Sequence, residues 1–179
     1  MQRFLLKFKL FSAFLLALFY LYATPCLAER VYQPPEEFIL ETFGGFSPEV
    51  RSLMMLGDRK KEVTKILSRK PRKLRTRYWE KEGKTVWILE EIGKTKLITA
   101  GFVVEDGKIS DAKVLVYRES HGDEVRHNFF LNQFFGLGLN SDRGLNGNID
   151  GISGATLSVR SMKKMATLAL FLDGESKKR

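Results

Sequence analysis

Strand-forming residues recur between three turn signals from residue 74 to residue 117, and this pattern limits the possible fold more than any other feature. Runs rich in Val, Ile, Leu, Thr and aromatic side chains occupy residues 74–79, 85–89, 97–104 and 109–117. They are separated by pairs that favour tight turns, Glu82-Gly83, Gly93-Lys94 and Asp106-Gly107. Because the connections are short, we expect an antiparallel meander of four strands.

Helical patterns precede this sheet. Ser47-Pro48-Glu49 offers a capping residue, a first-turn proline and an acidic side chain, which predicts a helix to about Leu56. A second helix is expected from Gly57 until Pro71 forbids its continuation. Helices packed on an antiparallel meander predict an α+β fold.

The chain after the sheet is also expected to be helical. Four phenylalanines within residues 125–135 predict a helix that buries one broad aromatic side, and residues 136–149 are rich in Gly and Asn and predict a loop. A final apolar helix is expected over residues 157–172, ended by Asp173-Gly174. The expected organisation is an N-terminal helical segment over 29–72, a main domain over 73–173 and a loose charged tail over 174–179.

The first 28 residues have the composition of an export signal. An apolar run over residues 10–22 follows three basic residues, Arg3, Lys7 and Lys9. Cleavage is expected after Ala28, which would remove Cys26, the one cysteine of the chain, and leave a periplasmic or otherwise extracytoplasmic protein without a disulfide. The alternative is an uncleaved segment that anchors the protein in the membrane.

The charge balance limits the partners of such a protein. The sequence has 30 basic and 21 acidic residues, and three of the basic ones and none of the acidic ones lie before residue 29, which leaves a formal charge of +6. An exported protein rarely meets nucleic acid, so we expect no nucleic-acid partner. The anions that fit are phospholipid headgroups, an acidic redox protein or a bound phosphate.

A heptapeptide before the last predicted helix carries the chemistry. It consists of Asp150-Gly151-Ile152-Ser153-Gly154-Ala155-Thr156. Gly154 lets the backbone approach a phosphate, Ala155 keeps the neighbouring volume small, and Thr156 offers a hydroxyl where a helix start turns unpaired N–H groups toward an anion. The residues alone fit equally a tight turn in which Ser or Thr caps the helix.

The heptapeptide resembles the Asp-x-x-Ser/Thr-Gly-Ala-Thr/Ser flavinylation motif of the FMN-binding domain family. This family includes flavin-carrying subunits of sodium-pumping NADH:quinone oxidoreductases and of Rnf-type complexes, and the last Thr or Ser of its motif is joined to FMN by a phosphoester bond. The resemblance, which spans roughly residues 84–172, implies covalent FMN on Thr156. It makes Ser153, Gly154 and Ala155 parts of the cofactor site. Asp150 is expected to orient a hydroxyl, to help hold a metal during attachment, or to cap a turn.

A second segment resembles the same family. Residues 117–122 have the sequence Tyr-Arg-Glu-Ser-His-Gly, which is similar to a strand that leads into the family's Glu-Ser/Thr-x-Gly turn. The resemblance implies that Glu119, His121 and Gly122 lie near the flavin. His121 fits equally an ordinary loop histidine.

These resemblances imply an exported flavoprotein that transfers electrons outside the cytoplasm. Nothing in the chain resembles a nucleotide-handling site. The resemblance implies that a separate FAD:protein FMN transferase, which uses Mg²⁺ and FAD, modifies Thr156. The electron partner is expected to be a redox protein or a membrane reductase of unknown identity. The chain is then an electron carrier rather than a self-standing catalyst, and its tether prevents loss of FMN to the outside.

Other interpretations fit parts of the sequence. Ser120, His121, Asp123 and Ser153 include the residue types of a hydrolase triad, but no Gly-x-Ser-x-Gly elbow surrounds Ser153. His121 and His127 make an incomplete zinc set, and no metal is assigned.

The densest basic run, residues 69–77, has two interpretations. It predicts a strand with one solvated face, or a docking patch for an acidic redox partner or a membrane surface. The second interpretation gives the main alternative function, an exported basic anion-binding or interaction module without flavin, in which the Thr156 turn is structural. Trp79 and Trp87 are expected to pack in the sheet rather than on flavin.

Overall fold

The computed structural model describes residues 29–178. The expected signal, including Cys26 and the cleavage point after Ala28, lies outside the described residues. In chain order the described elements are β1 (Arg30–Val31), α2 (Pro35–Thr42), β2 (Val50–Met54), α3 (Gly57–Leu67), β3 (Arg75–Lys81), β4 (Lys84–Ile92), β5 (Leu97–Glu105), β6 (Lys108–Tyr117), the 3-10 turn η1 (Asp123–Arg126), α4 (Asn128–Leu131), the 3-10 turn η2 (Asn132–Phe134) and α5 (Thr156–Ser176).

One six-stranded sheet organises these elements. Its order is β1-β6-β5-β4-β3-β2, and every neighbouring pair is antiparallel. The predicted α+β class and the four-strand meander are therefore confirmed, and β1 and β2 add one strand at each edge. Asp106 and Gly107 have φ angles of 50° and 72°, the backbone shape of a two-residue hairpin turn, so this predicted hairpin is confirmed as well.

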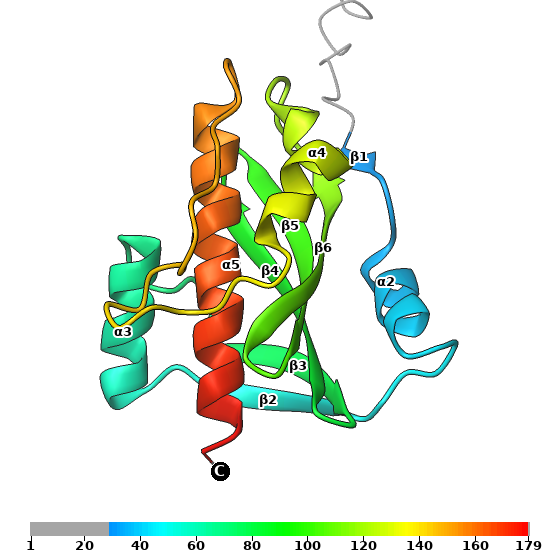
Figure 1. Cartoon of the computed structure of the whole chain (residues 1–179), viewed down its shortest axis with the longest axis vertical. Coiled ribbons are helices and arrows are strands. Elements are labelled where there is room, and N and C mark those ends of the chain that lie inside the picture. The colour runs from blue at the N-terminus through cyan, green and yellow to red at the C-terminus, as the bar shows by residue number, and fades with distance from the viewer. Residues whose placement is uncertain (1–28, 179) are drawn as a thin grey trace, which may run out of the picture.

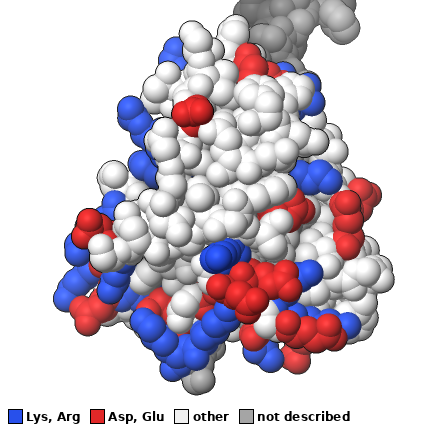
Figure 2. Space-filling view, in the orientation of Figure 1, with Lys and Arg blue, Asp and Glu red and all other residues white. Residues whose placement is uncertain are grey.

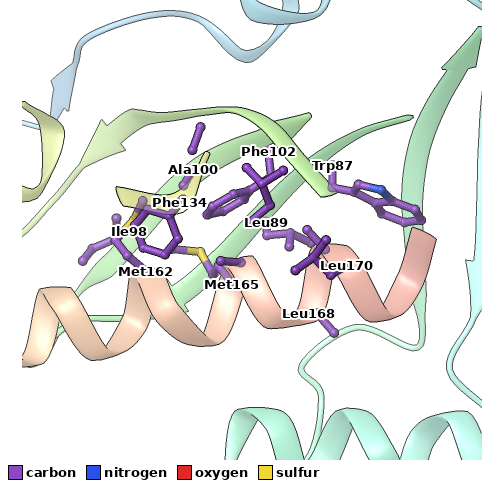
Figure 3. Packing of buried hydrophobic residues seen from close by; sticks show 14 of the residues in the cluster. Trp87, Leu89, Ile98, Ala100, Phe102, Phe134, Met162, Met165, Leu168 and Leu170 are labelled. Carbon is purple, nitrogen blue, oxygen red and sulfur yellow. The ribbon is translucent and has the colours of Figure 1, made fainter. Parts of the chain in front are cut away.

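Helices cover the sheet unequally. α5 and α3 pack on one face and the short α2 on the other (Figure 1). The larger of the two buried clusters lies under α5, where Met162 and Met165 face Phe102 and Phe134 (Figure 3). Because the central strand β5 is buried on both faces, residues 98–104 form an uninterrupted buried run.

Packing of the smaller hydrophobic cluster, between α2 and the sheet, requires glycine at position 101. Phe38 of α2 lies over Gly101 of β5, where a Cβ atom would come within 2.4 Å of the phenyl ring. The ring therefore occupies the space that any larger β5 residue would need. This contact seats α2 against the sheet.

The N-terminal segment differs from the prediction. A helix does form there, but over Pro35–Thr42, with proline in its first turn and Glu36 and Glu37 beside it. The helix predicted from Ser47 to Leu56 is wrong, because residues 50–54 are strand β2 and pair along their whole length with β3. Backbone pairing with an open sheet edge outweighs the local helix signal. The helix predicted from Gly57 is confirmed as α3.

The aromatic segment also differs from the prediction. Residues 123–134 form two 3-10 turns and one short helix in place of a single long helix. Phe130 and Phe134 are buried edge to face with ring centroids 5.4 Å apart, whereas Phe129 is 63% exposed and Phe135 is exposed too. The break lets two of the four rings enter the core and leaves the other two at the surface.

The final helix runs further than predicted. α5 continues through Gly174 to Ser176, so a helix end at Asp173 and a loose tail from residue 174 are wrong. Asp173 is 1% exposed, and its carboxylate accepts hydrogen bonds from Thr85 (2.8 Å) and Lys177 (3.0 Å). These bonds hold the last turn on the sheet. Within residues 29–178 no helix combines the length and apolarity needed to cross a bilayer.

Candidate functional site

Thr156 is the first residue of α5, and its side chain is exposed. The residue before it, Ala155, occupies the cap position and cannot hydrogen-bond the helix end through its side chain. Among the described residues none hydrogen-bonds the Thr156 hydroxyl. The interpretation of a Ser or Thr cap is therefore wrong, and the uncapped helix start leaves both its N–H groups and the hydroxyl available to a ligand.

The residues just before Thr156 set the direction of the helix. Gly154 has a φ angle of +82°, and no heavy atom lies within 4 Å of the position of a Cβ, so the backbone angle rather than crowding requires glycine. Ala155 is 2% exposed, and its N–H donates to Ile152 O at 3.0 Å. Ser153 is exposed. A small buried residue and a left-handed glycine therefore present Thr156 at the surface.

Asp150 takes part in a local anchor. Its N–H donates to Gln133 Oε1 at 2.7 Å, which joins the motif to η2. Its exposed carboxylate accepts a hydrogen bond from Asn148 Nδ2 at 3.2 Å. These bonds position the start of the heptapeptide, and a role of the carboxylate in cofactor attachment stays a prediction.

The turn after β6 is clamped to the first turn of α5. The Tyr117 hydroxyl donates to His121 O at 2.6 Å and shares a 2.8 Å hydrogen bond with Ser158 Oγ. Gly122 fills the remaining space with a φ angle of 87°, since a Cβ there would lie 2.8 Å from Ser158 Oγ. Burial raises the pKa of Tyr117, which keeps this hydroxyl a neutral donor. The structure thus brings Gly122 to the helix that carries Thr156.

Glu119 turns away from that helix. Its Oε1 accepts hydrogen bonds from the backbone N–H groups of Lys94 (2.5 Å), Thr95 (2.6 Å) and Lys96 (2.7 Å). Burial alone would raise the pKa of Glu119, but these donors outweigh it and the pKa lies below its ordinary value. The carboxylate, which is 8% exposed, fixes the turn between β4 and β5. Its expected place beside the flavin stays a prediction.

The candidate triad does not assemble. His121 is exposed, and its Nδ1 shares a 2.9 Å hydrogen bond with Ser120 Oγ. The Asp123 carboxylate instead accepts hydrogen bonds from Arg30 Nη1 (2.9 Å) and the Tyr32 hydroxyl (2.8 Å). Burial raises the pKa of Asp123, but these partners outweigh it and lower the pKa overall. Within residues 29–178, therefore, no carboxylate orients His121 in the manner of a hydrolase. Within the described part of the chain no three His, Cys, Asp or Glu side chains gather as metal ligands.

A groove of about 760 Å³ opens beside Thr156, between α3, residues 142–151 and α5. This α3–α5 groove has the volume of a small-molecule site. Apolar side chains line part of it, Ile66, Leu145, Ile149 and Val159. Its α5 wall begins at Thr156 and continues with Val159, Arg160, Lys163, Lys164 and Thr167.

The α3–α5 groove is cationic. Five basic residues line it against two acidic ones, Glu62 and Asp142. Glu62 is shared by Arg143 (3.1 Å) and Lys65 (3.4 Å), whereas Arg160 and Lys163 form no ion pair with any residue of 29–178. Lys and Arg side chains also gather along the left margin of the molecule beside α3 and α5 (Figure 2).

Thr156 and the Gly122 turn lie on different sides of α5. Thr156 lines the α3–α5 groove, whereas Ser158, two residues later and therefore about 200° around the helix, contacts Tyr117. The structure brings the two predicted segments to one helix start, but not to one wall of one cavity.

Two of the six basic side chains in the predicted run over residues 69–77 are paired with carboxylates. Arg69 pairs with the buried Glu91 at 2.5 Å, and Lys73 pairs with Glu90 at 3.0 Å. Arg75 and Arg77 are exposed on β3, so the strand with one solvated face is confirmed. The tryptophan prediction is also confirmed: Trp87 is fully buried and Trp79 packs partly buried on the smaller cluster.

Sequence reasoning missed the basic wall of the groove. Arg160, Lys163 and Lys164 follow Thr156 at intervals of four, seven and eight residues, the spacing of one helical face. That signal was present in the sequence. The sequence does not show that α3 packs beside this face of α5, and this packing makes the face one wall of a groove.

The comparison with known families agrees with this geometry. Residues 93–170 match the FMN-binding domain family, a span slightly shorter than the expected 84–172. It contains the Gly122 turn, the heptapeptide and most of α5. No curated protein and no solved structure matches the chain. Residues 93–170 are therefore similar to the FMN-binding domain family, which supports FMN as the ligand of this part of the chain.

Proposed function

We propose that this protein is an exported flavoprotein that carries FMN covalently on Thr156 and transfers electrons outside the cytoplasm. The observation that supports this most is the free Thr156 hydroxyl at the uncapped start of a 21-residue helix, in a segment similar to the FMN-binding domain family. A capping threonine would stand at the N-cap, the position that Ala155 holds here. The N–H groups at the start of α5 therefore have no side-chain cap among residues 29–178.

The residues present fit a phosphate ester. A phosphodiester on Thr156 Oγ1 carries a negative charge next to the positive end of the α5 dipole, which stabilises an anion by roughly 0.3–1 kcal/mol at an exposed site. Arg160 lies one helical turn further along the same wall, about 6 Å in helix rise. Gly154 and Ala155 leave no long side chain between the helix start and the phosphate.

The attachment step is a phosphoryl transfer from FAD, catalysed by a separate transferase with Mg²⁺. Thr156 Oγ1 forms a bond to the phosphorus on the flavin side of the pyrophosphate, and the bond from that phosphorus to the bridging oxygen breaks. AMP leaves with the bridging oxygen, and the hydroxyl proton passes to a base of the transferase. The chain contributes the accessible hydroxyl and the geometry around it.

Bound flavin supplies one-electron and two-electron chemistry, while the protein sets its position and surroundings. Export follows in this proposal from the basic and apolar pattern of residues 1–28. A redox protein or a membrane reductase then supplies or removes the electrons. The covalent bond keeps the cofactor in place where free flavin is scarce.

Coexpression with a flavin transferase tests the proposal. The exported wild-type protein should be yellow and should keep its flavin fluorescence through denaturing electrophoresis. Thr156→Ala should abolish the fluorescent band, and Thr156→Ser should retain part of it because the hydroxyl remains. Ser158→Ala, which leaves the heptapeptide unchanged, serves as the control that keeps the band.

Two results contradict the proposal. A fluorescent band of wild-type intensity in Thr156→Ala would place the flavin on another residue. A colourless wild-type protein, made beside a transferase that labels a known target, would leave the basic anion-binding module as the function.

A further inference from the structure

The cations of the α3–α5 groove exceed what one flavin phosphate needs. The groove has five basic and two acidic side chains, and one phosphodiester adds a single negative charge. Lys164 Nζ donates to Leu67 O at 2.7 Å and helps to join α5 to α3. Arg160 and Lys163 have no acidic partner among the described residues. Such unpaired cations beside a cofactor form a surface that attracts an anionic partner.

We propose that the α3–α5 groove is the docking surface for an acidic segment of the protein that exchanges electrons with the flavin on Thr156. This inference rests on the proposed function. It places the docking surface on α5 rather than on the basic run over residues 69–77, because the cations of the groove lie on the wall that begins at Thr156. Thr156, Arg160, Lys163 and Lys164 share one wall, so a partner bound there lies next to the cofactor.

The shape of the surface favours a protein over a bilayer. The unpaired cations line a recess with apolar side chains such as Ile66 and Val159 in it. A flat membrane surface would leave these apolar side chains uncovered. A helix or loop that projects acidic side chains with apolar ones among them can fill it, since the apolar side chains gain burial while the acidic ones meet the rim.

Electrostatic docking acts mainly on association. Charged side chains at the rim of an interface change the association rate and its salt dependence more than the final contact energy. The effect fades as salt shortens the Debye length, from about 30 Å at 0.01 M to about 8 Å at 0.15 M. Salt dependence is therefore the signature to measure.

The first experiment measures binding of a fluorescent oligoglutamate peptide, by anisotropy, to the full exported protein. The variants are Arg160→Glu/Lys163→Glu and the neutral pair Arg160→Gln/Lys163→Gln. The matched control is Arg75→Glu/Arg77→Glu, which changes charge equally at exposed β3 positions outside the groove. We expect the charge-reversed groove variant to weaken binding at least about tenfold at low salt, the neutral pair to weaken it less, and the control to stay within about twofold.

The second experiment connects the groove to the cofactor. The reduced flavin is oxidised by one-electron reagents of opposite charge, ferricyanide and hexaammineruthenium(III). Two equivalents of either reagent take the two electrons, and the protons pass to the buffer. The groove variant should lower the ratio of the ferricyanide rate to the hexaammineruthenium rate about tenfold at low salt, with little change near 0.15 M.

Several outcomes overturn the inference. Equal losses in the control variant would mean that net charge alone attracts the peptide. Groove-dependent binding of phosphatidylserine vesicles without peptide binding would make the surface a membrane contact, and stoichiometric displacement of the peptide by pyrophosphate would make it a small-anion site. If the ratio of the ferricyanide rate to the hexaammineruthenium rate is the same in the flavin-loaded groove variant as in the wild type, docking in the groove is refuted and the proposed function stands. An absence of flavin on Thr156 would instead refute the function, whatever the peptide does.

Discussion

Gly122 offers the sharpest test of how the turn after β6 is held against α5. A Cβ at this position would lie 2.8 Å from Ser158 Oγ and 3.1 Å from the Tyr117 hydroxyl, and the backbone φ angle is +87°. The left-handed conformation costs a non-glycine residue about 1–2 kcal/mol. Displacing the Ser158 hydroxyl removes a hydrogen bond with a net contribution of about 0.5–1.5 kcal/mol. Gly122→Ala should therefore lower the free energy of unfolding by roughly 2–3 kcal/mol.

Gly154→Ala is the matched control. Its φ angle is +82°, but nothing lies within 4 Å of the added Cβ, so only the backbone cost of about 1–2 kcal/mol applies. A Ser158→Ala background removes the 2.8 Å contact and leaves the Tyr117 hydroxyl at 3.1 Å, so Gly122→Ala should cost less there than in the wild-type background. Urea unfolding followed by tryptophan fluorescence measures each value, with an unchanged m-value as the check that the unfolded state is the same. If Gly122→Ala costs no more than Gly154→Ala in the wild-type background, the clamp described here is wrong.

Three further substitutions test the fold. Glu119→Gln should destabilise the protein by about 1.5–3 kcal/mol near neutral pH, because three backbone donors lose a charged acceptor. Since the folded-state pKa of Glu119 is lowered, this difference should be complete above its ordinary value of 4.5 and shrink as the pH falls through the folded-state pKa, which urea titrations at several pH values would measure. Asp173→Ala removes the acceptor of the Thr85 hydroxyl and should cost about 2 kcal/mol by the same assay; a neutral result would show that the last turn of α5 is held by apolar contacts alone. Phe38→Ala should cost about 3–5 kcal/mol by calorimetry because the ring over Gly101 leaves a cavity, and a cost below about 1 kcal/mol would mean that α2 is not firmly seated.

The meander was predictable because its signals are local. Glu82-Gly83 and Asp106-Gly107 take positive φ angles on both residues, and each connects two antiparallel strands that pair directly beside the turn. Strand β2 was not predictable in the same way. Of its five residues only Leu53 is buried, so its alternation is weak and its position depends on pairing with β3. The edge of a sheet is a tertiary feature that a local pattern does not contain.

The N-terminal helix shows that the local signal was not sufficient. Pro35, Glu36 and Glu37 give the same combination of first-turn proline and acidic residues that was assigned to Ser47-Pro48-Glu49. What distinguishes the two sites is the residue pair that follows, since Phe38 and Ile39 meet the second face of the sheet. Only the packing partner decides which of two similar helix signals is used.

The site was predictable in part. The sequence predicted a helix that starts close to Thr156, and α5 begins there. The resemblance placed Gly122 near the flavin, which stays a prediction, and the structure brings Gly122 to the first turn of α5. The sequence did not indicate that the Glu119 carboxylate would accept hydrogen bonds from three backbone N–H groups of the turn between β4 and β5. These bonds join residues more than twenty positions apart. The α3–α5 groove could not be predicted for the same reason, because its basic wall forms only when α3 packs beside α5.

Mass spectrometry of the native exported protein tests the central claim most directly. After proteolysis, the peptide that contains residues 150–160 should carry the mass of FMN less one water, and fragmentation should place the addition on Thr156. The intact mass also reports whether residues 1–28 have been removed. An unmodified peptide, from cells in which a flavin transferase labels another target, would contradict the account.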